Sequence, residues 1–204
     1  MSSETIWNLV TNFGDSAIGL PLALLVLLVL LASGWLRGAA AWFFSVASCV
    51  LAMLALKIGF GLAFAGCGPG EPGAMHFSPS GHAALSAVTY GGLAVLTGRH
   101  LPELARLVLA IATSAWVCTI AASRVELRFH SPVEAAVGLV VGAAAVALLV
   151  VAIGRSTGPR WLAPALTITT LAVLAAMHGT RWPVEEHLHA VAAWLRGSVG
   201  LCAR

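Results

Sequence analysis

Long, continuously apolar stretches constrain this chain more than any other feature of its sequence. Six of them follow one another, separated by short connections that are polar or rich in glycine and proline. Each is close to the ~20 residues that a helix needs to cross the hydrocarbon core of a bilayer. The predicted spans are Ala17–Leu36, Ala39–Leu62, Gly81–Thr97, Leu104–Ala122, Pro132–Ile153 and Trp161–Met177.

Composition agrees with a membrane protein. Charged residues make up 9% of the chain and hydrophobic residues 59%, whereas a soluble domain has about 25% charged residues. The apolar runs lack the period-two alternation of barrel strands. We therefore expect an all-α polytopic bundle of about six transmembrane helices, forming a single domain over residues 1–204. The net charge of +3 is small and its basic residues are not clustered, which argues against a nucleic-acid partner.

The two ends of the chain differ from the spans. Thr5 to Phe13 mixes apolar and polar residues, which fits either a short interfacial helix or a frayed polar end. The tail from Arg181 to Arg204 has apolar residues on one helical face, which predicts an amphipathic helix on the membrane surface. Cys49 and Cys118 lie inside apolar runs and are expected in the core.

Two polar clusters interrupt this apolar pattern. Residues 78–82 (Ser-Pro-Ser-Gly-His) open directly into the third span, and residues 123–134 lie between the fourth and fifth spans. A count of six spans places both clusters on one side of the membrane. Three other connections carry arginines without such a cluster. They contain Arg37, then Arg99 and Arg106, then Arg155 and Arg160. They fall on the other side of the membrane, which the positive-inside rule makes cytoplasmic. The clusters should therefore face outward, which is the periplasmic face for a bacterial inner membrane.

The first cluster is suited to binding an anion. The first N–H groups of a helix lack helical partners and its dipole adds positive charge. Gly81 would let a phosphate approach the backbone, and Ser80 offers a hydroxyl. The other interpretation is an ordinary N-cap formed by Ser78 or Ser80. Lys57 is the only lysine in the chain, and is either a phosphate ligand or an interfacial anchor.

The second cluster combines a cation, an imidazole and a carboxylate. Arg124 could bind a phosphate or compensate the dipole at a helix end. Glu134 could orient His130, fixing its tautomer and leaving one ring nitrogen as a nucleophile. However, Ser131 to Glu134 also reads as a capping box with Pro132 at the first helical position. Both interpretations of Glu134 remain open.

These residues resemble the superfamily of type 2 phosphatidic acid phosphatases and vanadium haloperoxidases. Its motifs are Lys-x6-Arg-Pro, Pro-Ser-Gly-His and Ser-Arg-x5-His-x3-Asp. This chain has the second motif intact at residues 79–82. It has the third as Ser123, Arg124 and His130, with Glu134 at the position of the aspartate. The resemblance covers about residues 57–150.

The resemblance implies a role for each residue. His130 would attack phosphorus and become a phosphohistidine, with Glu134 orienting it. His82 would protonate the leaving oxygen and then activate water. Lys57, Ser80, Gly81 and Arg124 would hold the phosphoryl oxygens. No metal or other cofactor is implied.

The chain departs from the pattern at two places. Phe64 and Ala65 stand where the first motif has Arg-Pro, so one cation is missing; Arg128 or His76 are candidate substitutes in the pocket. Glu134 in place of aspartate adds a methylene, which could shift the imidazole enough to reduce the rate.

The sequence thus predicts a membrane enzyme that hydrolyses lipid phosphate monoesters or pyrophosphates, with membrane lipids as its surroundings. Isoprenoid pyrophosphates, phosphatidylglycerol phosphate and phosphatidic acid are the substrate classes to consider. The alternative is a catalytically impaired relative that binds or carries phospholipid, motivated by the missing Arg-Pro. A haloperoxidase is disfavoured because those members of the superfamily are mostly soluble.

Overall fold

Seven helices are formed within residues 2–64 and 77–182. The computed structural model describes residues 2–64, 77–182, 187, 190–191 and 194. The helices are α1 (Ser3–Asn12), α2 (Ser16–Ala32), α3 (Leu36–Phe64), α4 (Gly81–Gly98), α5 (Glu103–Glu126), α6 (Pro132–Ile153) and α7 (Leu162–Met177).

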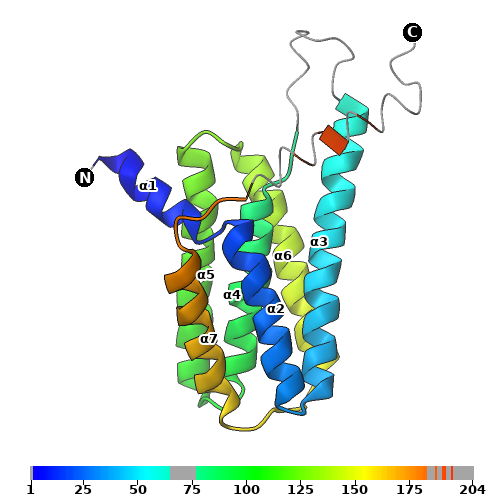
Figure 1. Cartoon of the computed structure of the whole chain (residues 1–204), viewed down its shortest axis with the longest axis vertical. Helices are drawn as coiled ribbons and strands as arrows, with labels where there is room; N and C mark the ends of the chain where they lie inside the picture. The colour runs from blue at the N-terminus through cyan, green and yellow to red at the C-terminus, as the bar shows by residue number, and fades with distance from the viewer. Residues whose placement is uncertain (1, 65–76, 183–186, 188–189, 192–193, 195–204) are drawn as a thin grey trace.

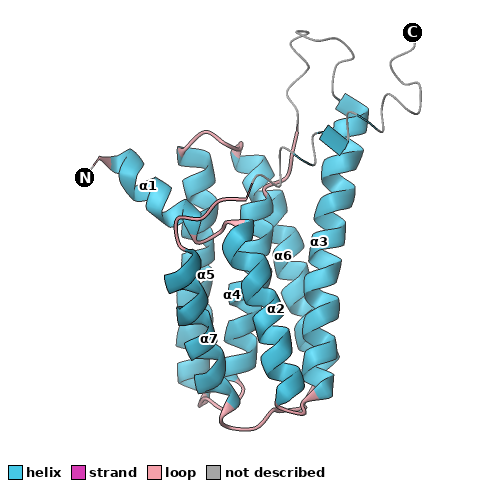
Figure 2. Ribbon diagram, viewed as in Figure 1, coloured by secondary structure: helices cyan, strands magenta, loops and turns pink. Residues whose placement is uncertain are grey.

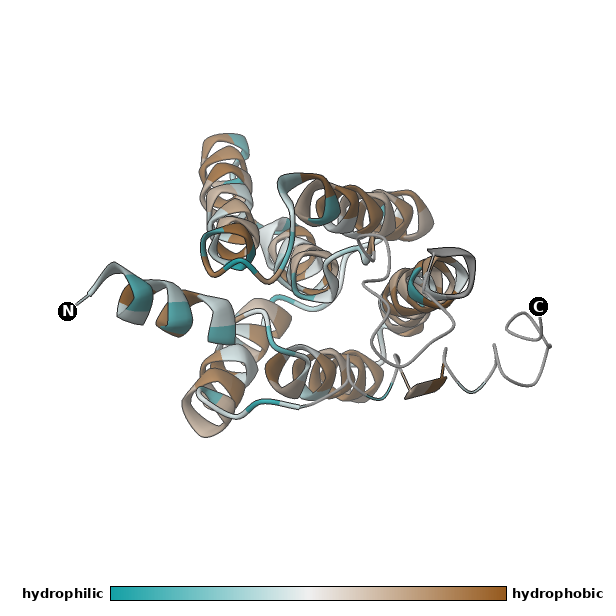
Figure 3. Cartoon of the chain, turned by 90° about the horizontal axis from the view of Figure 1, so that it is seen from above, coloured by the Kyte–Doolittle hydropathy of each residue, from teal (hydrophilic) through white to brown (hydrophobic). Residues whose placement is uncertain are grey.

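Six of these helices, α2 to α7, stand side by side as one bundle (Figure 1, Figure 2). They coincide with the six predicted spans to within a few residues, so the predicted all-α membrane bundle is confirmed. Helix α4 packs against α2, α3, α5, α6 and α7, and most of its residues are buried. Seen from above, hydrophobic residues colour the outer faces of the bundle (Figure 3), as expected of helices that face lipid.

Length and composition alone single out fewer spans than the bundle has helices. Among the described residues, four segments are long and apolar enough to cross a membrane, with α1 and α2 counted together; the others are α3, α5 and α6. Helix α7 is apolar but shorter. Helix α4 carries Ser86, Thr89, Gly92 and Gly98, which are buried by its neighbours, so it does not need a lipid-facing apolar surface.

Two glycines of α6 allow α4 to approach closely. A Cβ at Gly138 would lie 2.4 Å from the carbonyl oxygen of Ser80, and one at Gly142 would lie 2.5 Å from the carbonyl oxygen of Ala84. These two glycines form a G-x-x-x-G pair, and it brings the start of α4 against α6.

The connections with arginines gather at one end of the bundle. Arg37 Nε donates to the carbonyl of Ala152 at 3.0 Å, and Arg99 Nη1 donates to the carbonyl of Gly154 at 2.6 Å. These contacts join the α2–α3, α4–α5 and α6–α7 connections. The two polar clusters lie together at the opposite end, as the count of six spans requires.

Helix α1 and the cysteines complete the comparison with the sequence. Thr5 to Asn12 is helical rather than frayed, with Ser2 capping the start of α1 and Phe13 at its C-cap. Cys49 is buried as predicted, but Cys118 is exposed on α5. That prediction was wrong because an apolar run in a membrane helix can face lipid as well as core. Most of the predicted tail helix lies outside the described residues, as do His76, Cys67 and Cys202.

Candidate active site

The two polar clusters meet through Glu134. The backbone N–H of Ser80 donates to the Glu134 carbonyl at 3.0 Å, and the backbone N–H of Ser78 donates to Glu134 Oε1. Residues 78–80 are thereby fixed to the first turn of α6 just before α4 begins. A contact between two residues that are 56 positions apart in the sequence thus brings both clusters into one site.

Glu134 serves the capping box and faces His130 as well. Its Oε2 accepts the N–H of Ser131 at 2.7 Å, and Ser131 Oγ accepts the N–H of Glu134 at 3.3 Å. The same Oε2 lies 3.7 Å from Nδ1 of His130, whose ring is buried. The capping box is therefore present, and the same carboxylate lies close to His130, so that Nε2 is the ring nitrogen that points away from it.

Ser80 is the N-cap of α4. Its Oγ accepts the N–H of Ala83 at 3.4 Å, and the residue is fully buried. Gly81, the first residue of the helix, lines a cavity, and a Cβ there would lie 3.7 Å from Lys57 Cε. The first-turn N–H groups of α4 and its dipole are thus directed to a space bordered by a cation, an arrangement that favours an anion.

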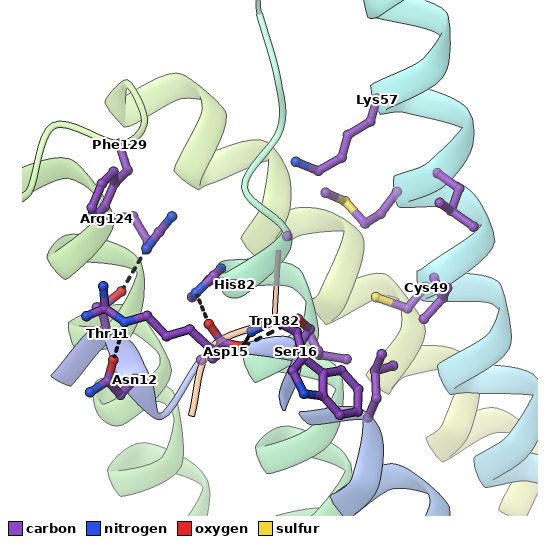
Figure 4. Close-up of a pocket in the computed structure, with 18 residues that line it drawn as sticks. Thr11, Asn12, Asp15, Ser16, Cys49, Lys57, His82, Arg124, Phe129 and Trp182 are labelled. Carbon is purple, nitrogen blue, oxygen red and sulfur yellow. Dashed lines mark hydrogen bonds and ion pairs between the residues drawn. The ribbon is translucent and has the colours of Figure 1, made fainter. Parts of the chain in front are cut away.

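A cavity of about 650 Å³ opens beside the start of α4. One part of it is polar and contains Lys57, His82 and Arg124 from three different helices (Figure 4). In that view Lys57 reaches in from one side and Arg124 from the other, with His82 between them. The other part is apolar and is lined by Leu20, Val50, Met53, Leu54 and Leu85 from α2, α3 and α4.

The cations of the cavity are held by neighbouring polar groups. Lys57 Nζ lies 3.2 Å from Ser78 Oγ. Arg124 is buried, donates from Nη1 to Thr11 Oγ1 at 3.1 Å and lies 4.4 Å from the centre of the Phe129 ring. Arg181, which follows α7, donates from Nε to Asn12 Oδ1 at 3.2 Å. Consecutive residues of α1 therefore orient two guanidinium groups toward one cavity.

An aspartate that belongs to none of the three motifs lies beside His82. Asp15 Oδ2 is 3.5 Å from His82 Nε2, and Asp15 is buried at the N-cap of α2. Asp15 is the only aspartate in the chain and directly precedes an apolar run. That isolation was the signal available in the sequence. Thr11 and Arg181 belong to no motif and had no comparable signal.

The structure gathers most, but not all, of the predicted residues around the cavity. Lys57, Gly81, His82 and Arg124 line it. His130, in the α5–α6 connection, and Glu134, in the first turn of α6, do not line it, but the His130 N–H donates to the carbonyl of Arg124. Arg128 is exposed, with a backbone φ of 57°, and does not line the cavity. His76 lies outside the described residues. Arg181 occupies the cavity instead, as a third cation beside Lys57 and Arg124.

The charged groups of the site are side chains of the protein. Within the described ranges, no group of three or more His, Cys, Asp or Glu side chains is placed to hold a metal ion. What the arrangement provides is a set of cations, a helix N-terminus and two histidines, each with its own carboxylate. Such a set can bind a phosphoryl group and exchange protons with it.

Comparisons with known proteins support this reading. A family model described as the PAP2 superfamily matches residues 22–158, which is well over half of the chain and includes both polar clusters. Neither the curated proteins nor the solved structures gave a significant match.

Proposed function

The chain belongs to the PAP2 superfamily, and we propose that it hydrolyses lipid phosphates or pyrophosphates through a phosphohistidine at His130. One observation carries the proposal: the cavity joins a cationic end at the start of α4 to an apolar end between α2, α3 and α4. A molecule with a phosphate head and a hydrocarbon chain fits both ends.

The proposed reaction has two displacements. His130 Nε2 attacks phosphorus, and the bond to the leaving oxygen breaks while His82 gives that oxygen a proton. Water then attacks the phosphohistidine, His82 takes a proton from it, and inorganic phosphate leaves with His130 restored. Lys57, Arg124 and the first-turn N–H groups of α4 neutralise charge on the equatorial oxygens in both steps, so the scheme requires no metal. Because His130 is buried, the phosphoryl group has to be drawn inward from the cavity.

Glu134 completes this scheme as the partner of His130. Its carboxylate holds Nδ1 and stabilises the positive charge that develops on the ring during attack. Hydrogen bonds from Ser78 and Ser131 fix that carboxylate. The longer side chain of glutamate is thus accommodated by the capping box, which supports activity despite the departure from aspartate.

The apolar end of the cavity predicts a dependence on chain length. We expect kcat/KM for alkyl phosphates, each assayed below its critical micelle concentration, to rise about fourfold per added methylene and then level off. Each buried CH₂ contributes about 0.8 kcal/mol, and the gain stops when the cavity is filled. Phosphate release by the purified protein in detergent measures this. A kcat/KM that does not depend on chain length would exclude a tail in the cavity.

We expect the site to lie on the outer side of the membrane, and this expectation can be tested separately. In a variant without its native cysteines, a membrane-impermeant maleimide should label a cysteine at position 128 in intact cells. A cysteine at position 155 should be labelled only after the cells are opened. Both positions are exposed and lie at opposite ends of the bundle. The reverse pattern would place the site on the cytoplasmic face and contradict the positive-inside argument.

A further inference from the structure

Asp15 contributes to the site from outside the stretch that the PAP2 model matches, residues 22–158. Its carboxylate contacts both His82 on α4 and the segment that follows α7. Oδ2 lies 3.5 Å from His82 Nε2 on α4, and Oδ1 accepts the backbone N–H of Trp182 at 3.3 Å. Oδ1 also accepts the N–H of Ala17 at 2.8 Å and so caps α2.

The backbone before Asp15 is tightly packed against the helix that carries His82. A Cβ at Gly14 would lie 2.6 Å from Ile120 Cγ2, 2.9 Å from Ser86 Oγ and 3.3 Å from His82 Cβ. Gly14 therefore lets the turn between α1 and α2 press directly on α4 and α5. With the N-cap bonds, this contact holds the carboxylate in a defined position relative to the imidazole.

The charges around His82 explain what a carboxylate would do there. Lys57 from α3, Arg124 from α5 and Arg181 after α7 line the same cavity as His82, and three cations disfavour a proton on its ring. Of the described residues that line the cavity, Asp15 alone is acidic. Glu134 on α6 is engaged with Ser78, Ser131 and His130.

We propose that Asp15 is a positioning residue for His82, holding its ring and stabilising the imidazolium that protonates the leaving oxygen. The inference rests on the proposed function and adds a second carboxylate–histidine pair to the one formed by Glu134 and His130. With Nε2 turned to Asp15, the proton passes to the leaving oxygen from Nδ1. The aspartate keeps its negative charge throughout, because three N–H groups surround it.

The test is Asp15→Asn, which keeps an oxygen for the N-cap bond but puts a neutral NH₂ donor in place of the carboxylate oxygen that faces His82. We expect kcat to fall about 10- to 100-fold, a part of what general acid catalysis contributes. The alkaline limb of the kcat/KM–pH profile should move to lower pH, because the imidazolium loses its counter-charge. Asp15→Ser, which also caps the helix, serves as the second variant. Glu126→Gln, an exposed acid at the same end of the bundle, should match wild type.

A double-mutant cycle separates positioning from a merely structural role. In a His82→Asn background, Asp15→Asn should change kcat less than about threefold, because an effect exerted through His82 disappears when His82 is absent. An equal loss in both backgrounds, an unchanged pH profile or an increase in kcat would overturn the inference.

A measurement without turnover keeps this inference distinct from the proposed function. If wild type released no phosphate from any substrate, the proposed function would fail. The histidine ring signals of detergent-solubilised protein, followed by NMR against pH, would still decide the pairing. Asp15→Asn should move the titration midpoint of His82 to lower pH, and an unchanged midpoint would refute the pair.

Discussion

Replacing His130 by alanine is expected to lower phosphate release from a lipid phosphate at least about a thousandfold. Removing the nucleophile of a covalent mechanism leaves only binding and charge stabilisation, and losses of this size or larger follow when a nucleophile is deleted. KM should change little, since Lys57 and Arg124 hold the head group in the variant too. Steady-state phosphate release by purified proteins in the same detergent measures the loss.

The control for this variant is His100→Ala. His100 is exposed at the opposite end of the bundle, with Nε2 2.9 Å from the carbonyl oxygen of Gly158, and its loss should leave kcat within about twofold of wild type. Because His130 is buried, His130→Asn serves as a second, polar substitution, and retained helical circular dichroism shows that each variant has folded. Equal phosphate release by wild type and both His130 variants would rule out the proposed enzymatic function and favour the phospholipid-binding alternative.

Gly138→Ala is expected to have the largest effect on stability. The added Cβ would lie 2.4 Å from the Ser80 carbonyl oxygen and 3.1 Å from Ala83 Cβ, so α4 has to move away from α6. Overpacking of this kind costs about 3 kcal/mol. The shift would also stretch the bond from Ser80 N–H to the Glu134 carbonyl and misplace Gly81 and His82. We therefore expect activity to fall at least about tenfold.

A matched substitution isolates the helix contact from the glycine itself. Gly59 lies inside α3, where an added Cβ would meet nothing within 4 Å. Gly59→Ala should be neutral or slightly stabilising, because alanine favours the helix by about 1 kcal/mol over glycine. The midpoints of denaturant unfolding in mixed micelles compare the two variants. A midpoint for Gly138→Ala equal to that for Gly59→Ala would show that the α4–α6 contact is looser than described.

The helices could be read from the sequence because a bilayer imposes length and continuous apolarity on them. The bounds of α4 and α6 were predicted closely, since Ser80 and Ser131 mark their starts as N-caps. The proximity of His130 to Glu134 was also readable, because the glutamate of a capping box folds back toward the residues that precede the helix. The third motif and the capping box use the same residues, so the sequence could not choose between them, and in the structure Glu134 completes the capping box while its carboxylate also lies near His130.

The remainder of the site depends on tertiary packing that no local pattern records. Asp15 meets His82 across 67 positions, and Arg181 meets Asn12 across 169. Neither belongs to a motif, and the missing cation of the first motif was sought at Arg128 and His76 rather than beyond α7. Arg128 was a poor substitute for a local reason, since it lies in an exposed turn and does not line the cavity. Cys118 was wrongly predicted to be buried, because an apolar sequence does not show whether a side chain faces the lipid or the protein core.

The most direct test of the account is the position of a trapped phosphoryl group. Wild-type protein mixed briefly with a ³²P-labelled lipid phosphate and denatured at alkaline pH should carry an acid-labile, alkali-stable label. Peptide mapping should place that label on His130, and His130→Ala should carry none. A label on a serine, or full turnover with no label on any histidine, would contradict the phosphohistidine site that Glu134 and the two polar clusters are proposed to form.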